Sequence, residues 1–351
     1  MDRDAATEVS ERVLGAIAAR TPLAIVGGGT KSFYGREPVG EPLDVGVHAG
    51  ITSYDPAELV LTARAGTRLA DIDAALSAAG QCMPFEPPRF GDAATLGGTI
   101  ACGIAGPARA YVGAVKDFVL GVTVMNGEGK SLRFGGQVMK NVAGYDIARM
   151  LVGSLGTLGI LMDVSMKVLP RPPQEKTLAF ELDAGAALRQ LGDWARLPSC
   201  ISASCWIDGR LFVRLAGSEA AIEADSVRLG GSDHSGSMLF WRSIREQTHM
   251  FFSDCLVRVV VPSLSPPDAM PGRCLIEWGG SQRWFNGDID FDQLQDAARA
   301  LGGFAVRFRS PNRAGEVFGV PGAVQSRLQR SLKSIFDPHG ILNPGRMYAA
   351  M

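Results

Sequence analysis

The sequence predicts an α+β protein with two main domains and a C-terminal segment. Three observations lead to this prediction: a length of 351 residues, short apolar runs that alternate with helical stretches, and a proline cluster near the middle of the chain. The cluster spans residues 169–173, where neither a helix nor a central strand can continue, and all five tryptophans follow it. We therefore expect domains at 1–172 and 173–310, followed by a segment at 311–351.

Apolar runs and glycine turns define the elements expected in the first domain. The stretch 68–79 has apolar residues at helical spacing and ends at Gly80, as is typical of a helix C-terminus. Asn126-Gly127 and Glu128-Gly129 separate two β-like runs, which is typical of a hairpin. Besides a polar helical stretch up to residue 20 and the helix over 68–79, we expect strands over 22–26, 59–65, 115–124, 131–134 and 160–169.

The second domain mixes strands and helices and predicts a smaller α+β layer. We expect strands over 176–182, 211–215, 257–261 and 273–278, and helices over 184–196 and 291–301. The tail over 324–336 is amphipathic, and Asn343-Pro344-Gly345-Arg346 beyond it predicts a turn that docks the tail on the first domain.

The composition narrows the possible functions. A net charge of −1, from 35 basic and 36 acidic residues, does not favour nucleic acid or an anionic membrane as the main partner. The sequence shows no secretory signal and no apolar run long enough to span a bilayer, so we expect a cytoplasmic protein. The six cysteines form no Cys-x-x-Cys and the four histidines show no zinc spacing, so no metal site is expected. Any redox chemistry must therefore use an organic cofactor or a partner.

The glycine run Gly27-Gly28-Gly29-Thr30 directly follows an apolar strand. Consecutive glycines can adopt positive φ and bring several N–H groups to one point, which suits a pyrophosphate, and Thr30 and Ser32 add hydroxyl donors. The run is not a Rossmann fingerprint, because Ser32 stands at the third glycine position, and it is not a P-loop. Taken alone, it fits a plain tight turn equally well.

Two further stretches of the first domain are rich in small residues. Residues 94–107 contain four glycines and no charged residue, so backbone there can approach a ligand closely; a flexible loop is the alternative. Residues 140–146 and 153–160 again place glycines before a strand. One such stretch is weak evidence, but three in one domain predict a single extended cofactor wrapped by backbone.

Residues 23–169 resemble the FAD-binding domain of the vanillyl-alcohol oxidase/p-cresol methylhydroxylase (PCMH) superfamily. The matching motifs are GGGT at 27–30, DPA at 55–57, AGT at 65–67, Pro87-Pro88, ATLGG at 94–98, KDFVLG at 116–121, KNVAGYD at 140–146 and GSLGTLGI at 153–160. The chain is most similar in detail to the FAD-binding subunits of bacterial glycolate oxidases. That similarity rests on LGGTIACG at 96–103, FGGQVMK at 134–140, WGGSQRW at 278–284 and DPHGILNPGRM at 337–347.

The resemblance implies a fold, a cofactor and partners. The fold is a PCMH-type FAD-binding domain of two α/β subdomains, then a smaller α+β cap domain and a C-terminal segment that returns to the FAD domain. The cofactor is FAD, which would oxidise a 2-hydroxy acid such as glycolate or relay its electrons. The implied partners are a paralogous FAD-binding catalytic subunit and an iron–sulfur subunit, through which the chain would contact the inner face of the membrane.

The resemblance also implies which residues contact the cofactor. The glycine run would hold the FAD pyrophosphate by backbone N–H groups, the stretch after residue 94 would reach the flavin, and the last stretch would contribute backbone atoms. The resulting cofactor-binding candidates are Gly27, Gly28, Gly29, Thr30, Ser32, Pro88, Thr95, Gly97, Gly98, Ala101, Cys102, Gly103, Ile104, Gly106, Gly159 and Ile160.

The chain departs from the superfamily in two places. Relatives with covalent flavin often carry a histidine in or just after the glycine loop; here Thr30 and Lys31 stand there, so we expect non-covalent FAD, with Cys102 as a packing residue rather than a tether. D-lactate and 2-hydroxyglutarate dehydrogenases of the superfamily carry a histidine-rich metal motif in the cap. Only His234 and His249 occur in that stretch, so no base or Lewis acid for the substrate is evident.

The catalytic candidates are therefore weak. Arginine clamps carboxylates in bidentate fashion, so Arg283 or Arg346 could grip glycolate, while Lys140 could offset phosphate or flavin charge. A buried strand end with a surface ion pair is the favoured interpretation of the arginines, and a solvated side chain explains Lys140 nearly as well. Two alternative functions stay open, a non-catalytic assembly subunit and a stand-alone FAD-dependent 2-hydroxy-acid dehydrogenase.

Overall fold

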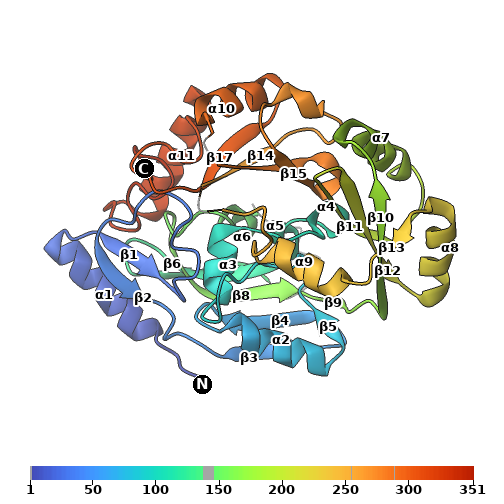
Figure 1. The fold of residues 1–351 in the computed structure, drawn as a ribbon. Helices are drawn as coiled ribbons and strands as arrows, with labels where there is room; N and C mark the ends of the chain where they lie inside the picture. The colour runs from blue at the N-terminus through green and yellow to red at the C-terminus, as the bar shows by residue number, and fades with distance from the viewer. Residues whose placement is uncertain (1, 137–145, 254, 288) are drawn as a thin grey trace.

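A computed structural model describes residues 2–136, 146–253, 255–287 and 289–351 (Figure 1). The part before residue 172 contains α1 (Ala6–Ala19), β1 (Leu23–Val26), β2 (Glu41–Asp44), β3 (Ile51–Asp55), β4 (Val60–Arg64), α2 (Leu69–Ala78), β5 (Gln81–Cys82), α3 (Leu96–Cys102), α4 (Arg109–Val112), α5 (Val115–Phe118), β6 (Val119–Met125), β7 (Ser131–Gly135), α6 (Ile147–Met150), β8 (Ile160–Lys167) and β9 (Leu169–Pro170).

The remainder of the chain supplies a second set of elements. They are β10 (Gln174–Glu181), α7 (Ala184–Trp194), β11 (Ile201–Ile207), β12 (Arg210–Gly217), α8 (Glu219–Leu229), β13 (Ser232–Asp233), α9 (Ser237–Arg245), β14 (Leu256–Val260), η1 (Pro267–Ala269), β15 (Cys274–Glu277), η2 (Trp278–Gly280), β16 (Gln282–Asn286), α10 (Phe291–Ala300), β17 (Phe304–Arg309) and α11 (Ala323–Phe336). None of the described helices is long and apolar enough to cross a membrane.

An antiparallel five-stranded sheet, ordered β3-β4-β8-β6-β7, forms the centre of the first part. Its buried side chains pack with those of α2 and α3 in one apolar core. Between β6 and β7, Asn126 Oδ1 accepts hydrogen bonds from the N–H groups of Glu128 (3.0 Å) and Lys130 (2.9 Å), which confirms the predicted hairpin.

A second, smaller layer combines the parallel pair β1-β2 with α1. Val9 and Val13 of α1 pack with Leu23 and Leu43 of the two strands, and Leu342 from the far end of the chain joins the same core. The glycine run 27–30 therefore follows β1, and β1 is held in place by α1 and by the C-terminal segment.

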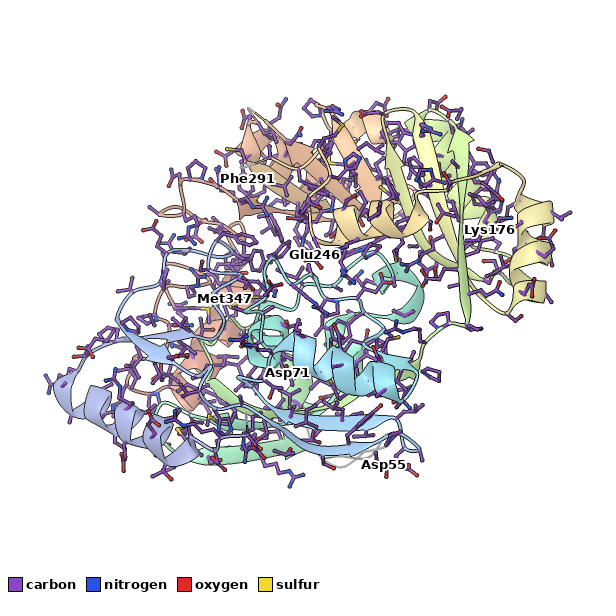
Figure 2. All side chains as sticks on the ribbon, turned by 60° about the horizontal axis from the view of Figure 1, so that its bottom comes forward. Asp55, Asp71, Lys176, Glu246, Phe291 and Met347 are labelled. Atoms are coloured by element: carbon purple, nitrogen blue, oxygen red, sulfur yellow. The ribbon has the colours of Figure 1, made fainter. Side chains whose placement is uncertain are left out.

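The second part is built on an eight-stranded antiparallel sheet, ordered β13-β10-β12-β11-β15-β16-β14-β17. Helices α7 and α8 pack on one end of its outer face, and α10 packs on the other end (Figure 1). Helix α9 lies on the opposite face, where Trp241 and Ile244 join a core that also contains Tyr34 and Leu155 of the first part. Side chains of the two parts face one another, and Glu246 lies between them (Figure 2). The prediction of an α+β fold is confirmed, whereas the domain limits 172/173 and 310/311 stay a proposal.

The C-terminal segment returns to the first part, as predicted. The Leu23 N–H donates to the carbonyl of Ile341 (2.7 Å), and the Asn343 N–H donates to the carbonyl of Leu23 (2.9 Å), so the segment extends the β1 edge. The buried ammonium of Lys333 donates to the carbonyl of Thr157 (2.9 Å) and to Asp337 Oδ2 (2.6 Å).

The strand prediction over 115–124 was wrong in its first turn. Val115–Phe118 is the short helix α5, because Asp117 Oδ2 accepts a hydrogen bond from the Ala114 N–H (2.8 Å) and the buried Val115 and Phe118 lie one helical turn apart. The strand begins only at Val119.

No helix was predicted within residues 94–107, where Leu96–Cys102 forms helix α3, so the alternative of a flexible loop does not hold for these residues. Thr95 Oγ1 accepts a hydrogen bond from the Gly98 N–H (3.3 Å) and begins the helix, and Gly103, with φ of 64°, ends it. Glycine is required at position 97 by packing, since a Cβ there would lie 2.6 Å from Ala65 Cβ.

Several elements of the second part escaped prediction, namely β11, β16, β17, α8 and α9. Strand β11 is buried along most of its length, so its sequence lacks the alternation of apolar and polar residues that reveals a half-exposed strand. The eight-stranded sheet of the second part is consequently larger than the α+β layer that the sequence predicted.

Replacing Lys333 with methionine should destabilise the fold by about 3 kcal/mol or more, because Asp337 would remain as a buried charge without its partner. Urea unfolding of the whole chain measures the loss. Lys130→Met is the matched control: its ion pair with Glu128 is exposed to solvent, and its removal should change the stability little. Equal losses in both variants would contradict an anchoring role for Lys333.

Candidate cofactor site

The glycine run after β1 is shaped by its contact with residues 93–95. A Cβ on Gly28 would overlap the carbonyl oxygen of Ala93, so only glycine fits there without movement of the backbone. Gly29 has φ of 70°, in the region that favours glycine, and its carbonyl accepts a hydrogen bond from the Ser32 N–H (3.1 Å). A Cβ on Gly27 would lie 2.8 Å from Thr95 Oγ1. The first two small-residue stretches therefore touch, as the sequence predicted.

The C-terminal segment closes the other side of this region. Asn343 Oδ1 accepts a hydrogen bond from the Ile25 N–H (2.7 Å), and Asn343 Nδ2 donates to the carbonyl of Leu155 (2.6 Å). The side chain thus joins β1 to the stretch 153–160. Because the side chain is buried, its amide fixes both segments against the C-terminal turn.

A cavity of about 120 Å³ lies where these segments meet. Nine of the predicted cofactor-binding residues line it: Gly27, Gly28, Gly29, Thr30, Ser32, Thr95, Gly98, Ala101 and Cys102. The lining also includes Lys31, Leu155 and Asn343, which were not among the predicted contacts, and Arg346, which was predicted as a catalytic candidate. We refer to this space as the cofactor cavity.

The other predicted contacts do not line the cofactor cavity. Gly97 packs on Ala65, Gly103 ends α3, and Gly159 lies against the side chain of Val124. The carbonyl of Gly106 accepts a hydrogen bond from Trp278 Nε1 (3.0 Å). Pro88, Ile104 and Ile160 are also buried in the interior. Contact of these seven residues with a cofactor stays a prediction.

The lining of the cofactor cavity carries two cations and no carboxylate. Lys31 and Arg346 line it at 7% and 8% exposure, and its lining contains neither aspartate nor glutamate. The Lys31 ammonium donates one long hydrogen bond, to the carbonyl of Arg89 (3.4 Å), and burial lowers the pKa of Lys31. Two desolvated cations without a carboxylate favour an anionic ligand with more than one negative charge.

Arg346 contributes hydrogen bonds to the backbone as well as a positive charge. Its guanidinium donates to the carbonyls of Ser32 (3.0 Å), Tyr34 (2.7 Å) and Arg36, and so holds the chain that follows the glycine run. Burial, assisted by the nearby Arg313, lowers the pKa of Arg346 to about 10. Burial also raises the pKa of the Cys102 thiol to about 11, against the opposing effect of Lys31 and Arg346. The thiol is therefore neutral at physiological pH.

The remaining catalytic candidates are not brought to this cavity. Arg283 is fully buried in β16 and donates to the carbonyls of Pro266 (2.9 Å) and Ser265, which agrees with the structural interpretation of that residue. Lys140 lies outside the described residues. Among the residues that the structure describes, no group of three or more His, Cys, Asp or Glu side chains is placed to hold a metal ion.

Lys31 and Asn343 were missed for different reasons. Lys31 directly follows the glycine run, so its neighbourhood was predicted, but nothing in a lone lysine indicates that its side chain turns inward. Asn343 belongs to the DPHGILNPGRM motif, whose role could be read only as a turn, because its partners at Ile25 and Leu155 are distant in the sequence.

Comparison with known proteins agrees with this geometry. Residues 4–135 match the family described as "FAD binding domain". Over 343 residues, 97% of each chain, the protein is 46% identical to "Glycolate oxidase subunit GlcE" of Escherichia coli (strain K12). This chain belongs to the GlcE family. The predicted resemblance and the prediction of FAD as the cofactor are thereby confirmed.

More distant relatives of this GlcE-family chain match shorter stretches of it. "Glycolate oxidase subunit GlcD" of Bacillus subtilis (strain 168) is 34% identical over 144 residues, which are 41% of this chain and 30% of that protein. A "D-lactate dehydrogenase" of Anaerostipes hadrus is 32% identical over 35% of this chain and 25% of that protein. The fold is shared with a solved "alkyldihydroxyacetonephosphate synthase" at a TM-score of 0.68 and 16% identity, over 96% of this chain and 74% of that one.

Replacing Gly28 with alanine should abolish the retention of FAD, because the added Cβ cannot coexist with the Ala93 carbonyl and must separate the two walls of the cavity. Flavin absorbance of the purified chain measures retention. Gly15→Ala is the matched control, since nothing lies within 4 Å of a Cβ at that helical position. A Gly28→Ala protein as yellow as the wild type would contradict a cradle at this loop.

Proposed function

We propose that this chain is the FAD-binding subunit of a multi-subunit glycolate oxidase and that it holds its FAD without a covalent bond. The observation that carries the proposal is the cofactor cavity, where a glycine run, the N-terminus of α3 and two buried cations meet in the absence of any carboxylate. The name of the 46% identical relative supports the assignment to glycolate oxidation.

The cavity suits the diphosphate of FAD. A volume of about 120 Å³ is below the size of pockets that enclose whole drug-sized ligands, so it would hold the diphosphate while the rest of the dinucleotide lies beyond it. The doubly anionic diphosphate would supply the counter-charge that Lys31 and Arg346 lack, and glycine N–H groups would donate to its oxygens. Cys102, a neutral thiol beside both cations, would pack against the cofactor rather than bind it covalently.

FAD, when bound, accepts a hydride from the carbon that carries the hydroxyl group of a 2-hydroxy acid. The cap stretch 173–310 contains only His234 and His249, so it lacks the histidine-rich motif that would assist removal of the hydroxyl proton. We therefore infer that a paralogous FAD-binding subunit oxidises glycolate to glyoxylate, and that this chain relays electrons toward an iron–sulfur subunit. Contact with the inner face of the membrane would arise through these partners.

Two alternatives make different use of the same fold. An assembly subunit without functional flavin would not need Lys31 and Arg346 to line a cavity free of carboxylates. A stand-alone 2-hydroxy-acid dehydrogenase would need a proton acceptor near the flavin. The charge of the cavity supports the first proposal over the assembly subunit, and the lack of a histidine-rich motif in the cap stretch supports it over the stand-alone enzyme.

Glycolate-dependent dye reduction separates the three functions. The isolated chain should contain FAD but should not reduce the dye with glycolate. Dye reduction should begin only when the partner subunits are added. Gly28→Ala in this chain should then lower the rate of the whole complex while the flavin of the partner is retained. Reduction by the isolated chain would support the stand-alone enzyme, and full activity of a complex that lacks FAD in this chain would support the assembly subunit.

Lys31→Met should weaken FAD binding at neutral pH by about tenfold or more, the scale of a lost charge-assisted hydrogen bond. Because the ammonium form binds the anion, wild-type affinity should be constant at low pH and fall as the pH rises through the lowered pKa of Lys31. Quenching of FAD fluorescence measures both effects. Lys31→Arg keeps the charge and should lose this pH dependence but not the affinity.

The nucleotide used as the probe tests where Lys31 acts. ADP, which also carries a diphosphate, should lose affinity for Lys31→Met as FAD does, whereas riboflavin should not. Lys130→Met serves as the control for a lost surface charge. A loss confined to FAD and riboflavin would contradict contact with the diphosphate.

A further inference from the structure

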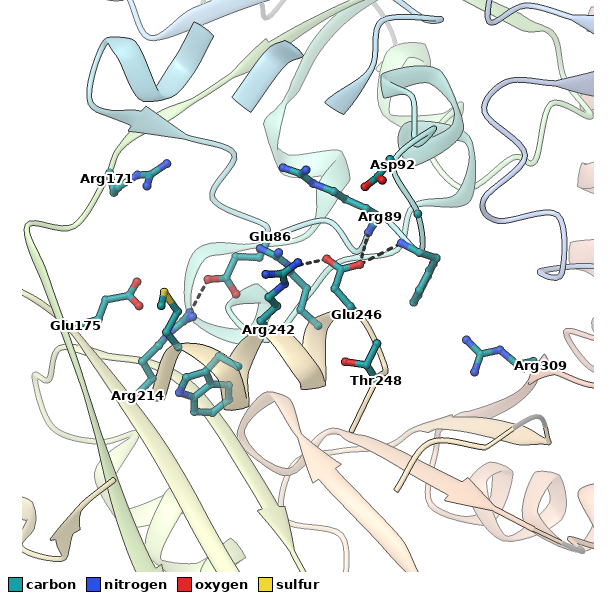
Figure 3. A pocket seen from close by; sticks show the side chains of 15 residues that line it. Glu86, Arg89, Asp92, Arg171, Glu175, Arg214, Arg242, Glu246, Thr248 and Arg309 are labelled. Carbon is teal, nitrogen blue, oxygen red and sulfur yellow. Dashed lines mark hydrogen bonds and ion pairs between the residues drawn. The ribbon is translucent and has the colours of Figure 1, made fainter. Parts of the chain in front are cut away.

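A second and larger cavity, of about 890 Å³, lies between α9 and the first part of the chain (Figure 3). Six arginines from both parts of the molecule line it: Arg89, Arg171, Arg214, Arg242, Arg245 and Arg309. Four carboxylates also line it, so positive charge is in excess. We call this cavity the arginine groove.

Two of the four carboxylates are already occupied by internal donors. Glu86 accepts from Arg214 Nη2 (2.7 Å) and from the Ala108 N–H (3.1 Å). Glu246 accepts from Arg245 Nε (2.8 Å) and from the N–H groups of Arg89 (2.9 Å) and Phe90 (3.0 Å). These pairs fix the walls of the groove and leave those two carboxylates little capacity to neutralise other arginines.

Arg171 and Arg242 provide the charge that is available to a ligand. Both are exposed, and within the described part of the chain neither forms an ion pair. Arg171 donates a hydrogen bond to Ser77 Oγ (2.9 Å), which leaves its charge uncompensated. The other two carboxylates of the lining, Asp92 and Glu175, are exposed at the groove and are screened by water.

The groove also carries one exposed apolar side chain at its rim. Met238, at the start of α9, lines the groove and is 80% exposed. Methionine and arginine are both enriched at protein–protein interfaces. The volume also exceeds by far what a two-carbon acid needs, so a longer occupant fits better.

From these observations we propose that the arginine groove docks an acidic segment of a partner subunit, with carboxylates at Arg171 and Arg242 and an apolar side chain against Met238. The inference rests on the proposed function, which supplies a multi-subunit complex. It goes beyond that function by assigning the face through which the chain assembles. Charge complementarity and the exposed apolar side chain at the rim favour a protein segment over a small acid.

The test is assembly of the full chain, affinity-tagged and co-expressed with the other subunits of its oxidase. Arg171→Glu combined with Arg242→Glu should lower the recovery of partner subunits by about tenfold or more. Recovery by the wild-type chain should fall as the salt concentration rises. The FAD content and melting temperature of the variant should equal those of the wild type. Arg330→Glu, an exposed arginine on α11 outside the groove, is the matched control and should leave recovery unchanged.

A photo-crosslinking residue at position 238 identifies what occupies the groove. The expected product joins this chain to a carboxylate-rich segment of a partner, and charge reversal in that segment should restore assembly of the double variant. A crosslink to a second copy of this chain, or intact assembly of the double variant, would overturn the proposal. So would saturable binding of glycolate or citrate that the double variant abolishes without affecting assembly. A wild-type chain devoid of FAD would instead refute the proposed function.

Discussion

The central constraint of this structure is the burial of two cations in a cavity without carboxylates. Lys31 and Arg346 come from opposite ends of the chain, and both are more than nine-tenths buried. Desolvation of a charge is costly unless a counter-charge or several dipoles replace the lost water. Arg346 meets this cost with three backbone carbonyls, whereas Lys31 has one carbonyl at 3.4 Å. An anion at this site would offset the cost for Lys31, and the proposed diphosphate of FAD would supply that charge.

The architecture around the cavity follows from this constraint. Glycine is needed at position 28 because the run must touch the Ala93 carbonyl, and Asn343 must reach back to Ile25 and Leu155 to hold the third wall. The buried pair Lys333–Asp337 in turn fixes the segment that carries Asn343 and Arg346. The last thirty residues consequently belong to the cofactor site as much as the glycine run does.

Sequence patterns could predict the parts of this fold whose signals are local. The hairpin at Asn126, the helix that ends before Gly80 and the glycine run are examples, since turn chemistry and positive φ leave their mark on neighbouring residues. The buried strand β11 and the inward orientation of Lys31 are set by distant partners and left no such mark. The helix α3 was missed because its Gly97 is needed for packing on Ala65, which no propensity scale contains.

The segment Arg89–Phe90 joins the two cavities into one system. On one side, its backbone carbonyl receives the ammonium of Lys31; on the other, its two N–H groups donate to Glu246, whose carboxylate also binds Arg245. Lys31 and Glu246 are close enough that the charge of Glu246 raises the pKa of Lys31. Under the docking proposal, carboxylates at Arg171 and Arg242 would lie in the same cavity as Glu246, so their charge would add to the field that Glu246 exerts at Lys31. Because coupling between two sites is reciprocal in free energy, FAD bound at Lys31 would alter the groove to the same extent.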